Sequence, residues 1–447
     1  MASHHGVALS KLDHESADSV ESAFEVFSVP HSHTSTIKAE WVEVQPEREN
    51  TGGVIEFDVP GSDDLYTDLN QTFLEVEVKI RLANGDELPP GENHLLIPGD
   101  NFMHSLFQTA TVKIEGTDVE YESNYPHRAY TENLLNYGLE TKKSRLEVSS
   151  GWYEDVGQAK NFAQMGAAVA ARKAKCAASR TQSFYGKLRL SAFAQSRNLT
   201  PGIRWSLRLT RTTPETCLMA TNNAPAGGAK VEITKCALWV RKVQANPALQ
   251  QVQAEMIQNG HDVKIPINRV RTTFYVTPAG IMSRRINLGN NAQRPNRLIV
   301  GLINHVAKSG AYPLNPFRFA HCNVNGIELQ IDGLPVGKRY EPDFDNGVYG
   351  REYANLFINT GRMDSDSGNG ITRASFADGH ALYAFDNSGD LCGGDEGMHL
   401  VKNGSLSVNV SFSQPTQETL SLFVYQEFDD IIAINKERRP VMTSSVL

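Results

Sequence analysis

The acidic loop at residues 364–370 has a composition that could bind a cation. Its sequence, Asp364-Ser-Asp366-Ser-Gly368-Asn369-Gly370, begins like a calcium-binding loop, in which closely spaced carboxylate oxygens surround a hard cation. The sixth position of such a loop is a glycine and the twelfth is a bidentate glutamate, whereas here they are Asn369 and Ser375. We therefore expect a polar turn at this place and no required metal.

The remaining carboxylates and histidines do not form a catalytic pattern. Acids stand in pairs at residues 63–64 and 429–430, and two carboxylates with separated pKa values could act as acid and base, but adjacent acids in turns are usually solvated. Five histidines lie at irregular spacing within residues 4–33, unlike the ligands of a zinc site. The sequence also lacks the serine-nucleophile, zinc-protease and phosphate-loop motifs. From these residues we expect a protein that is not an enzyme and binds no cofactor.

The composition is that of an ordinary folded protein. The chain has 447 residues, a net charge of −8 and 40% hydrophobic residues, which excludes collagenous, coiled-coil and disordered classes. No run approaches the roughly 20 apolar residues of a membrane span. The first residues lack a secretory signal, so we expect synthesis in the cytosol. Five widely separated cysteines predict free thiols and no disulfide framework.

Strict alternation of apolar and polar residues is the dominant pattern of the chain. It runs through residues 74–82, 203–210, 406–412 and 420–424. This period is typical of strands that bury one face and leave the other wet. Short strands separated by Gly, Pro and Asn turns predict an all-β protein of sandwich or barrel type.

One linker helix is predicted between two β-rich halves. Asn246 and Pro247 suit the start of a helix, Leu249, Val252 and Met256 fall on one face, and a glycine at 260 can end it. The predicted divisions are an N-terminal arm at 1–50, a first half at 51–245, the linker helix at 246–262, a second half at 263–432 and a C-terminal tail at 433–447.

A strand, turn and short helix occur once in each half with matching residues. Residues 112–116 and 329–333 share an apolar, acidic and glycine pattern, and a helix with an Arg-x-Tyr start follows each of them. The corresponding helix residues are Arg128, Tyr130 and Leu134 in the first half and Arg351, Tyr353 and Phe357 in the second. The repeat predicts an internal duplication, in which these side chains pack at equivalent places under the two sandwiches.

Residues 156–214 form a basic stretch with eleven Lys or Arg and no Asp or Glu. Such charge could contact a polyanion. The stretch lacks regularly interleaved aromatic residues, however, so a solvated or interface-paired surface is the favoured alternative. The candidate residues for an interior or subunit-boundary role are Lys160, Arg172, Lys173, Lys175 and Arg180.

A small apolar cluster stands in the acidic N-terminal segment. Residues 1–50 contain three Lys or Arg and nine Asp or Glu, a composition that cannot offset its own ordering entropy. Within it, Phe24, Val26, Phe27 and Val29 predict a short anchor that binds a groove on a neighbouring subunit or on a smaller partner protein. The alternative is that the cluster tucks under its own first sandwich.

Motifs throughout the chain resemble one protein family. They are Asn315-Pro-Phe-Arg-Phe319, Gln330-Ile-Asp-Gly333, Pro342-Asp-Phe-Asp-Asn-Gly347, Gly368-Asn-Gly-Ile371, Leu382-Tyr-Ala-Phe-Asp386 and Tyr425-Gln-Glu-Phe-Asp429, with Phe27-Ser-Val-Pro30, Arg128-Ala-Tyr130 and Leu134-Leu-Asn-Tyr-Gly138 in the first half. On these motifs the chain resembles, from about residue 24 to 435, the major capsid proteins of Polintons (Mavericks) and adintoviruses.

The resemblance implies a double jelly-roll, that is, two tandem eight-stranded antiparallel sandwiches in one chain. It further implies a homotrimer that acts as a pseudo-hexameric capsomer in an icosahedral virion shell. The implied partners are neighbouring capsomers, penton proteins and minor capsid proteins, while the basic stretch suggests weak contact with genomic DNA. The acidic net charge fits a shell protein better than a genome-coating one. The alternative is a secreted double jelly-roll protein that binds or processes glycans, which would need a signal, disulfides and an acidic cleft.

Overall fold

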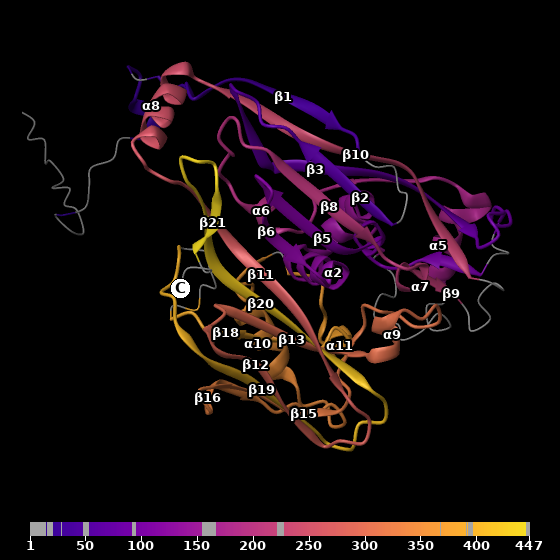
Figure 1. Ribbon diagram of the computed structural model, residues 1–447. Helices are drawn as coiled ribbons and strands as arrows, with labels where there is room; N and C mark the ends of the chain where they lie inside the picture. The colour runs from indigo at the N-terminus through magenta and orange to yellow at the C-terminus, as the bar shows by residue number, and fades with distance from the viewer. Residues whose placement is uncertain are drawn as a thin grey trace, which may run out of the picture.

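Two antiparallel β-sandwiches form the body of the protein (Figure 1). In Figure 1 the first sandwich, in indigo to magenta, lies beside the second, in orange to yellow. The mainly β architecture confirms the predicted fold class. The computed structural model describes residues 15, 21–27, 29–47, 53–91, 95–153, 167–220, 228–366, 368–389, 391 and 397–443.

The first sandwich consists of two four-stranded sheets, ordered β1-β10-β3-β7 and β2-β8-β5-β6. The bounds of these strands are β1 (Thr36–Val44), β2 (Val54–Val59), β3 (Leu65–Leu82), β5 (Phe107–Ile114), β6 (Thr117–Glu122), β7 (Gln182–Gly186), β8 (Trp205–Arg211) and β10 (Ala229–Ala245). A separate short pair joins β4 (Leu96–Pro98) to β9 (Leu218–Ala220).

The second sandwich has two sheets with the path orders β11-β20-β13-β18 and β12-β19-β15-β16. The bounds are β11 (Val263–Thr277), β12 (Ser283–Gln293), β13 (Arg297–Asn304), β15 (Val324–Ile331), β16 (Leu334–Tyr340), β18 (Leu382–Asp386), β19 (Asn403–Phe412) and β20 (Leu420–Ile434). Two additions are β21 (Pro440–Met442), which pairs with β20, and the short pair β14 (Phe319–Ala320) and β17 (Asp378–Gly379).

Both halves share one strand order. When the eight strands of each sandwich are counted along the chain, the two sheets have the orders 1-8-3-6 and 2-7-4-5 in either half. Strands that are distant in sequence therefore pair within one sheet while neighbours in sequence often lie in opposite sheets, which is the jelly-roll arrangement. The structure thus contains the double jelly-roll that the resemblance implied.

The alternating segments form strands because one face of each enters a core. In β3 the side chains of Leu74, Val76, Val78 and Ile80 are fully buried, while the polar residues between them are only partly buried on the other face. Strand β8 shows the same alternation, and its apolar face packs in the core of the first sandwich. Here the prediction from periodicity is confirmed.

Strand β20 departs from the predicted pattern. Alternation at residues 420–424 predicts one wet face, yet every residue of β20 from Leu420 to Phe428 is buried. The reason is that the outer face is covered as well. Phe423, at a position predicted to be wet, packs against Phe274 of β11 and against His127 from the first half of the chain.

The two ends of the fold differ from the predicted boundaries. Residues 36–44, predicted as part of the arm, form the edge strand β1, which is mostly exposed on both faces and therefore has little alternation. The segment that precedes the first sheet ends at Ser35. At the other end, β20 runs to Ile434 and β21 pairs with it inside the predicted tail.

Short helices fill the connections between strands. The α-helices are α1 (Phe102–Ser105), α2 (Tyr125–Asn136), α3 (Leu139–Lys142), α4 (Arg145–Ser150), α5 (Ala167–Cys176), α6 (Ser191–Ala194), α7 (Pro214–Cys217), α8 (Pro247–Gln258), α9 (His305–Ser309), α10 (Gly350–Ile358) and α11 (Arg373–Ala377), with 3-10 turns η1 (Ser22–Phe24) and η3 (Ala177–Ser179). Helix α2 follows β6 and α10 follows β16, so the two repeated motifs occupy the same place in the strand order of their halves.

The predicted linker helix is present as α8. The side-chain oxygen of Asn246 accepts a hydrogen bond from the Ala248 amide at 3.0 Å, and Pro247 stands at the first helical position. Gly260 follows the helix with a φ of +89°, a conformation that glycine adopts without strain. In Figure 1, α8 lies at one end of the molecule, beyond the sandwiches.

Candidate assembly sites

The repeated arginines have different surroundings in the two halves. The side chain of Arg128 is buried and lies 2.7 Å from Glu120 and 2.9 Å from Glu132, measured between nitrogen and carboxylate oxygen. The side chain of Arg351 is 51% exposed and pairs with its neighbour Glu352 at 2.8 Å. The difference arises because α2 lies against the second half of the chain, whereas Arg351 of α10 is at the surface.

The repeated tyrosines also contact different surfaces. Tyr130 and Leu134 are buried in the hydrophobic cluster of the second sandwich, whereas the repeat predicts that they pack under the first. The Tyr130 ring stacks on Trp152 with 5.0 Å between ring centroids and on Phe317 with 4.8 Å. This stack joins α2 to the chain that leads into β14.

Tyr353 and Phe357 stay within the second half. Their rings meet edge to face at 5.0 Å, and the Tyr353 hydroxyl donates a hydrogen bond to the Ile371 carbonyl at 2.8 Å. Both are only partly buried beside the cluster. The two repeat helices therefore share a position along the chain but not a packing role.

A buried polar network extends from Arg128 across the junction of the sandwiches. Arg128 donates to the hydroxyl of Ser191 at 3.0 Å, and that hydroxyl accepts the Val270 amide of β11 at 3.3 Å. Glu122, 3.8 Å from Arg128, accepts the Thr272 hydroxyl of β11 at 2.6 Å. Burial raises the pKa of Glu122, while the charge of Arg128 acts in the opposite direction. The network fixes both halves in one arrangement, since its partners come from each.

Two histidines lie at the same junction, His127 buried and His380 partly buried. The His127 ring packs among Phe274, Phe317 and Phe423, and its Nε2 lies 3.1 Å from the Pro316 carbonyl. Burial lowers the pKa of His127 to about 3. His380, whose Nε2 lies 3.4 Å from the Tyr130 hydroxyl, also has its pKa lowered to about 3 by burial. Sequence reasoning missed both, because isolated histidines carry no spacing signal.

The acidic loop contacts the first half through a lysine. The buried amine of Lys142 donates one hydrogen bond to the Leu134 carbonyl at 2.9 Å and another to the Asn369 carbonyl at 2.5 Å. The side-chain oxygen of Asn369 accepts a hydrogen bond from the Ile371 amide. Among the described residues, no group of three or more His, Cys, Asp or Glu is placed to hold a metal ion.

Removal of divalent metal is expected to leave the protein unaffected. Because the Asn369 carbonyl is bound by the amine of Lys142, which is itself a cation, EDTA should leave the melting temperature within about 1 °C of the untreated protein. Differential scanning calorimetry with and without EDTA measures this. A drop of several degrees that added calcium reverses would contradict it.

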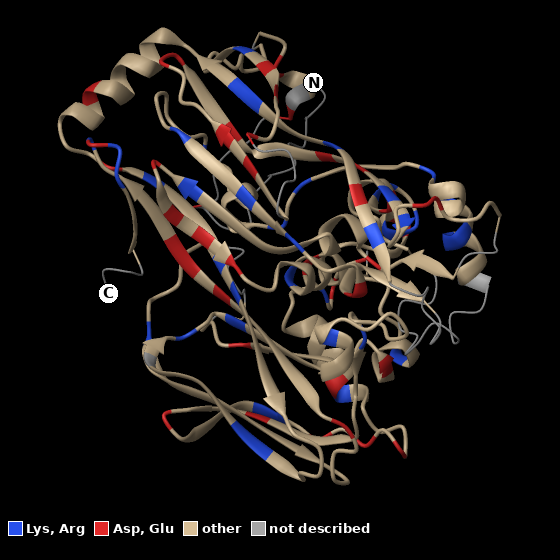
Figure 2. Cartoon of the chain, turned by 45° about the vertical axis from the view of Figure 1, so that its right-hand side comes forward, with Lys and Arg blue, Asp and Glu red and all other residues tan. Residues whose placement is uncertain are grey.

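The basic candidates do not form one surface. Arg172 is buried; it donates to the Pro98 carbonyl at 3.1 Å and to Asp100 at 3.2 Å, with its guanidinium over the Tyr153 ring. It therefore presents no charge outside the chain. Lys175 pairs with Glu147. Lys173 is partly buried and Arg180 is exposed, whereas Lys160 lies outside the described residues. Figure 2 shows Lys and Arg spread over both sandwiches, with Asp and Glu among them.

The N-terminal apolar cluster is exposed. Phe24, Val26, Phe27 and Val29 have between 73% and 101% of their surface open to solvent. The chain is fixed just after them, because the Asn246 amide donates to the Ser35 carbonyl at 2.9 Å. Within the single chain the cluster does not tuck under its own first sandwich.

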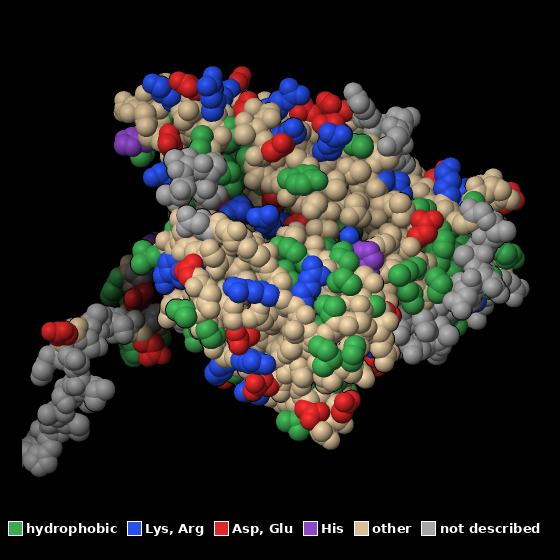
Figure 3. All heavy atoms as spheres, turned by 60° about the horizontal axis from the view of Figure 1, so that its bottom comes forward, with side chains coloured by type: hydrophobic (Ala, Val, Ile, Leu, Met, Phe, Trp, Pro, Cys, Tyr) green, Lys and Arg blue, Asp and Glu red, His purple; other side chains and the backbone are tan. Residues whose placement is uncertain are grey.

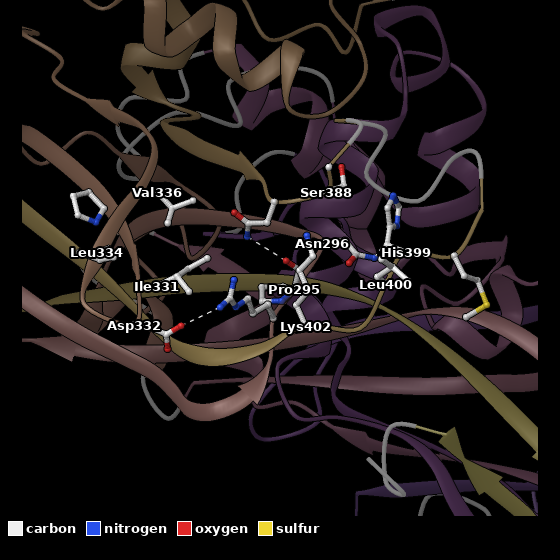
Figure 4. A pocket seen from close by; sticks show the side chains of 15 residues that line it. Pro295, Asn296, Ile331, Asp332, Leu334, Val336, Ser388, His399, Leu400 and Lys402 are labelled. Carbon is white, nitrogen blue, oxygen red and sulfur yellow. Dashed lines mark hydrogen bonds and ion pairs between the residues drawn. The ribbon is translucent and has the colours of Figure 1, made fainter.

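A cavity of about 780 Å³ opens beside the exposed edge strand β16 (Figure 4). Leu334 and Val336 of β16 line it together with Leu400, and an ion pair of Arg294 with Asp332 at 3.0 Å crosses one side. Figure 3 shows exposed hydrophobic side chains interspersed with charged ones on the face that it brings forward. Apolar side chains at an edge strand suit contact with another polypeptide.

The same cavity contains a histidine–aspartate pair. His399 Nδ1 lies 2.9 Å from Asp429, while the nearby Ser388 hydroxyl donates to Asp386. The serine hydroxyl thus points toward a carboxylate, whereas a serine nucleophile would have to point toward the imidazole.

No helix in the described ranges has the length and apolar content to cross a membrane.

Comparisons with known proteins identify the fold. No family model matches the chain. The uncharacterized protein F54H12.2 of Caenorhabditis elegans is 24% identical over 433 residues, covering 94% of this chain and 100% of that protein.

Three solved structures cover nearly the whole chain at 12% identity. A chain of the Sputnik virophage structure matches with a TM-score of 0.64, covering 98% of this chain and 94% of that chain. A chain of the PBCV-1 virus capsid matches at 0.58, covering 93% and 99%. The mavirus major capsid protein matches at 0.51, covering 97% and 96%. These neighbours are double jelly-roll viral major capsid proteins, so the fold of this chain is theirs.

Proposed function

We propose that this chain is a viral major capsid protein of the Polinton and adintovirus type, which its motifs resemble. One observation carries the proposal: the same 1-8-3-6 and 2-7-4-5 sandwiches occur twice, in a chain that matches a Sputnik virophage chain over 98% of its length. The protein is a structural subunit without enzymatic activity, and its place is the virion shell after synthesis in the host cytosol. Nothing in the comparisons supports the secreted glycan-binding alternative.

The functional unit is a homotrimer. Three chains with two jelly-rolls each place six similar sandwiches around one axis, which suits a sixfold position in an icosahedral lattice. The buried network around Arg128 supports this arrangement, because it holds the two sandwiches of one chain as a single rigid block. Its partners are neighbouring capsomers, penton proteins and minor capsid proteins. Among the basic candidates, the exposed Arg180 and the partly buried Lys173 make weak contact with genomic DNA.

The proposed divisions follow the sequence, adjusted to the strands. Residues up to Ser35 act in assembly, and the sandwiches predicted at 51–245 and 263–432 form the shell. The first begins earlier than predicted, with β1 as its first strand, and the second has β21 added at its edge. The arm cluster of Phe24, Val26, Phe27 and Val29 supplies the contact between subunits, since it is exposed in the single chain.

The purified chain is expected to elute as a trimer. Each interface should bury more than roughly 2,000 Å², the range of obligate assemblies, so dilution to nanomolar concentration should not release monomer. Light scattering after size exclusion measures the mass, and negative-stain microscopy should show pseudo-hexameric particles or shells. A well-folded monomer at micromolar concentration would contradict the proposal.

A further inference from the structure

Helix α8 has an apolar face that the described chain leaves open. None of its residues is buried, and Leu249, Val252 and Met256, which share one face, are 37%, 54% and 50% exposed. Beside the helix lies a cavity of about 520 Å³, to which α8 contributes Leu249 and Met256. We call this cavity and the open face of α8 the α8 groove. Its further lining residues include Tyr66, Val243 and Val263.

The exposed arm cluster begins at the edge of this groove. Ser35 and Thr36 line the cavity, and the Ser35 carbonyl accepts the amide of Asn246, directly before α8. Phe24 to Val29 thus lie only a few residues from the groove, yet their apolar side chains face solvent. In the single chain the cluster is exposed and does not fill the groove, so the groove is open to the cluster of another copy.

The charges of the two surfaces are complementary. Between Lys11 and Lys38 the arm has five Asp or Glu and no Lys or Arg. The groove and the adjoining cavity of about 540 Å³ on the other side of α8 carry four cations against two carboxylates. The cations are Arg197, Lys264, Lys436 and Arg438, and the carboxylates are Asp63 and Asp262. The negative charge of the arm therefore complements the net positive charge around the α8 groove, and its apolar cluster matches the apolar lining.

We propose that the α8 groove of one copy binds the Phe24–Val29 cluster of a second copy of this chain. The inference rests on the proposed capsid function, because it requires many copies in contact. Exchange of identical segments is a low-cost route to association, since each copy offers both the segment and its receptor. The exchanged arm covers the apolar face of α8 and removes its own side chains from water.

Disulfide capture between differently tagged chains tests the contact. One chain carries Phe27→Cys and the other Val252→Cys, and both are expressed together. We expect a covalent product that contains both tags, lost on reduction. The matched control pairs Phe27→Cys with Val148→Cys, a valine of similar exposure on α4, and should give at least tenfold less product. Equal yields from the two pairs would overturn the proposal.

Placing both cysteines in one chain distinguishes the source of the arm. Capture between chains should dominate, whereas a bond formed only within one chain would show that each arm occupies its own groove and would overturn the proposal. A bond from Phe27→Cys to some other protein, with none to α8, would overturn it in favour of a different partner.

A charge variant of the groove separates this contact from the capsid role itself. Val252→Glu places a carboxylate where the acidic arm binds, and we expect at least tenfold fewer shells from trimers of unchanged melting temperature. Val148→Glu makes the same substitution at a similarly exposed valine on α4, away from the groove, and should assemble normally. Normal shells from Val252→Glu would overturn the groove contact while leaving the capsid function intact. Failure of the unmodified chain to form trimers would instead contradict the capsid function, and disulfide capture would still report on the arm.

Discussion

Replacement of Arg128 with alanine is expected to lower the free energy of unfolding by about 3–5 kcal/mol, the usual cost of breaking a buried ion pair. The guanidinium lies within 4 Å of Glu120, Glu122 and Glu132. Without it, three carboxylates remain close together with little water around them. They would have to take up protons or open the junction between the sandwiches, and either response costs stability.

Two further variants make the measurement specific. Arg128→Lys retains the charge but loses the planar fork that reaches Glu120, Glu132 and Ser191 together, so an intermediate loss is expected. Arg351→Ala, at the corresponding position of the second half, should cost about 0–1 kcal/mol because its side chain is half exposed. Urea unfolding at one fixed protein concentration provides the comparison. Equal losses for Arg128→Ala and Arg351→Ala would contradict the assigned role of the network.

Acid is expected to destabilise the fold through His127 and His380. In the folded protein burial holds the pKa of each at about 3, whereas the unfolded chain has ordinary values near 6.5. Between pH 6.5 and 3 the unfolded state therefore binds more protons, and stability falls as the pH falls. The full effect approaches about 1.4 kcal/mol per pH unit for each histidine, or about 2 kcal/mol each at pH 5.

A variant isolates this contribution from the carboxylates. The raised pKa values of Glu122 and Glu427 act in the opposite direction, so the informative quantity is the difference between the parent and His127→Gln. An amide at this position can still donate to the Pro316 carbonyl and does not titrate. We expect its stability to fall by about 2 kcal/mol less than that of the parent between pH 7 and pH 5. The exposed His261→Gln is the matched control, and an identical pH dependence in all three proteins would disprove the prediction.

The strands could be predicted from the sequence wherever one face is wet. The core residues of β3 and β8 alternate because water covers their other face. Periodicity misses β1, an edge strand exposed on both sides, and misjudges β20, which a helix from the other half covers. The double jelly-roll followed from the family motifs, since alternation by itself leaves sandwich and barrel topologies open.

The candidate residues were harder to predict than the fold. The repeat matches Arg128 with Arg351 and Tyr130 with Tyr353, yet a repeat records the place on a helix and not the surface that the helix meets. Tyr130 contacts Phe317, which is distant in sequence. His127 and Lys142 acquire their importance only through burial at the same junction, and single polar residues carry no pattern that reveals this.

The stack of Trp152, Tyr130 and Phe317 can form only after the ribosome has synthesised Phe317. Ribosomes add about 5–20 residues per second, so roughly ten to forty seconds separate the appearance of Tyr130 from that of Phe317. Throughout this interval the emerging first half presents the apolar side of α2 without its cover. Nascent chains on one polysome can stick together through that side, and correct folding competes with this side reaction. Yield from a producing cell therefore depends on elongation rate and chaperone supply as well as on the stability of the finished protein.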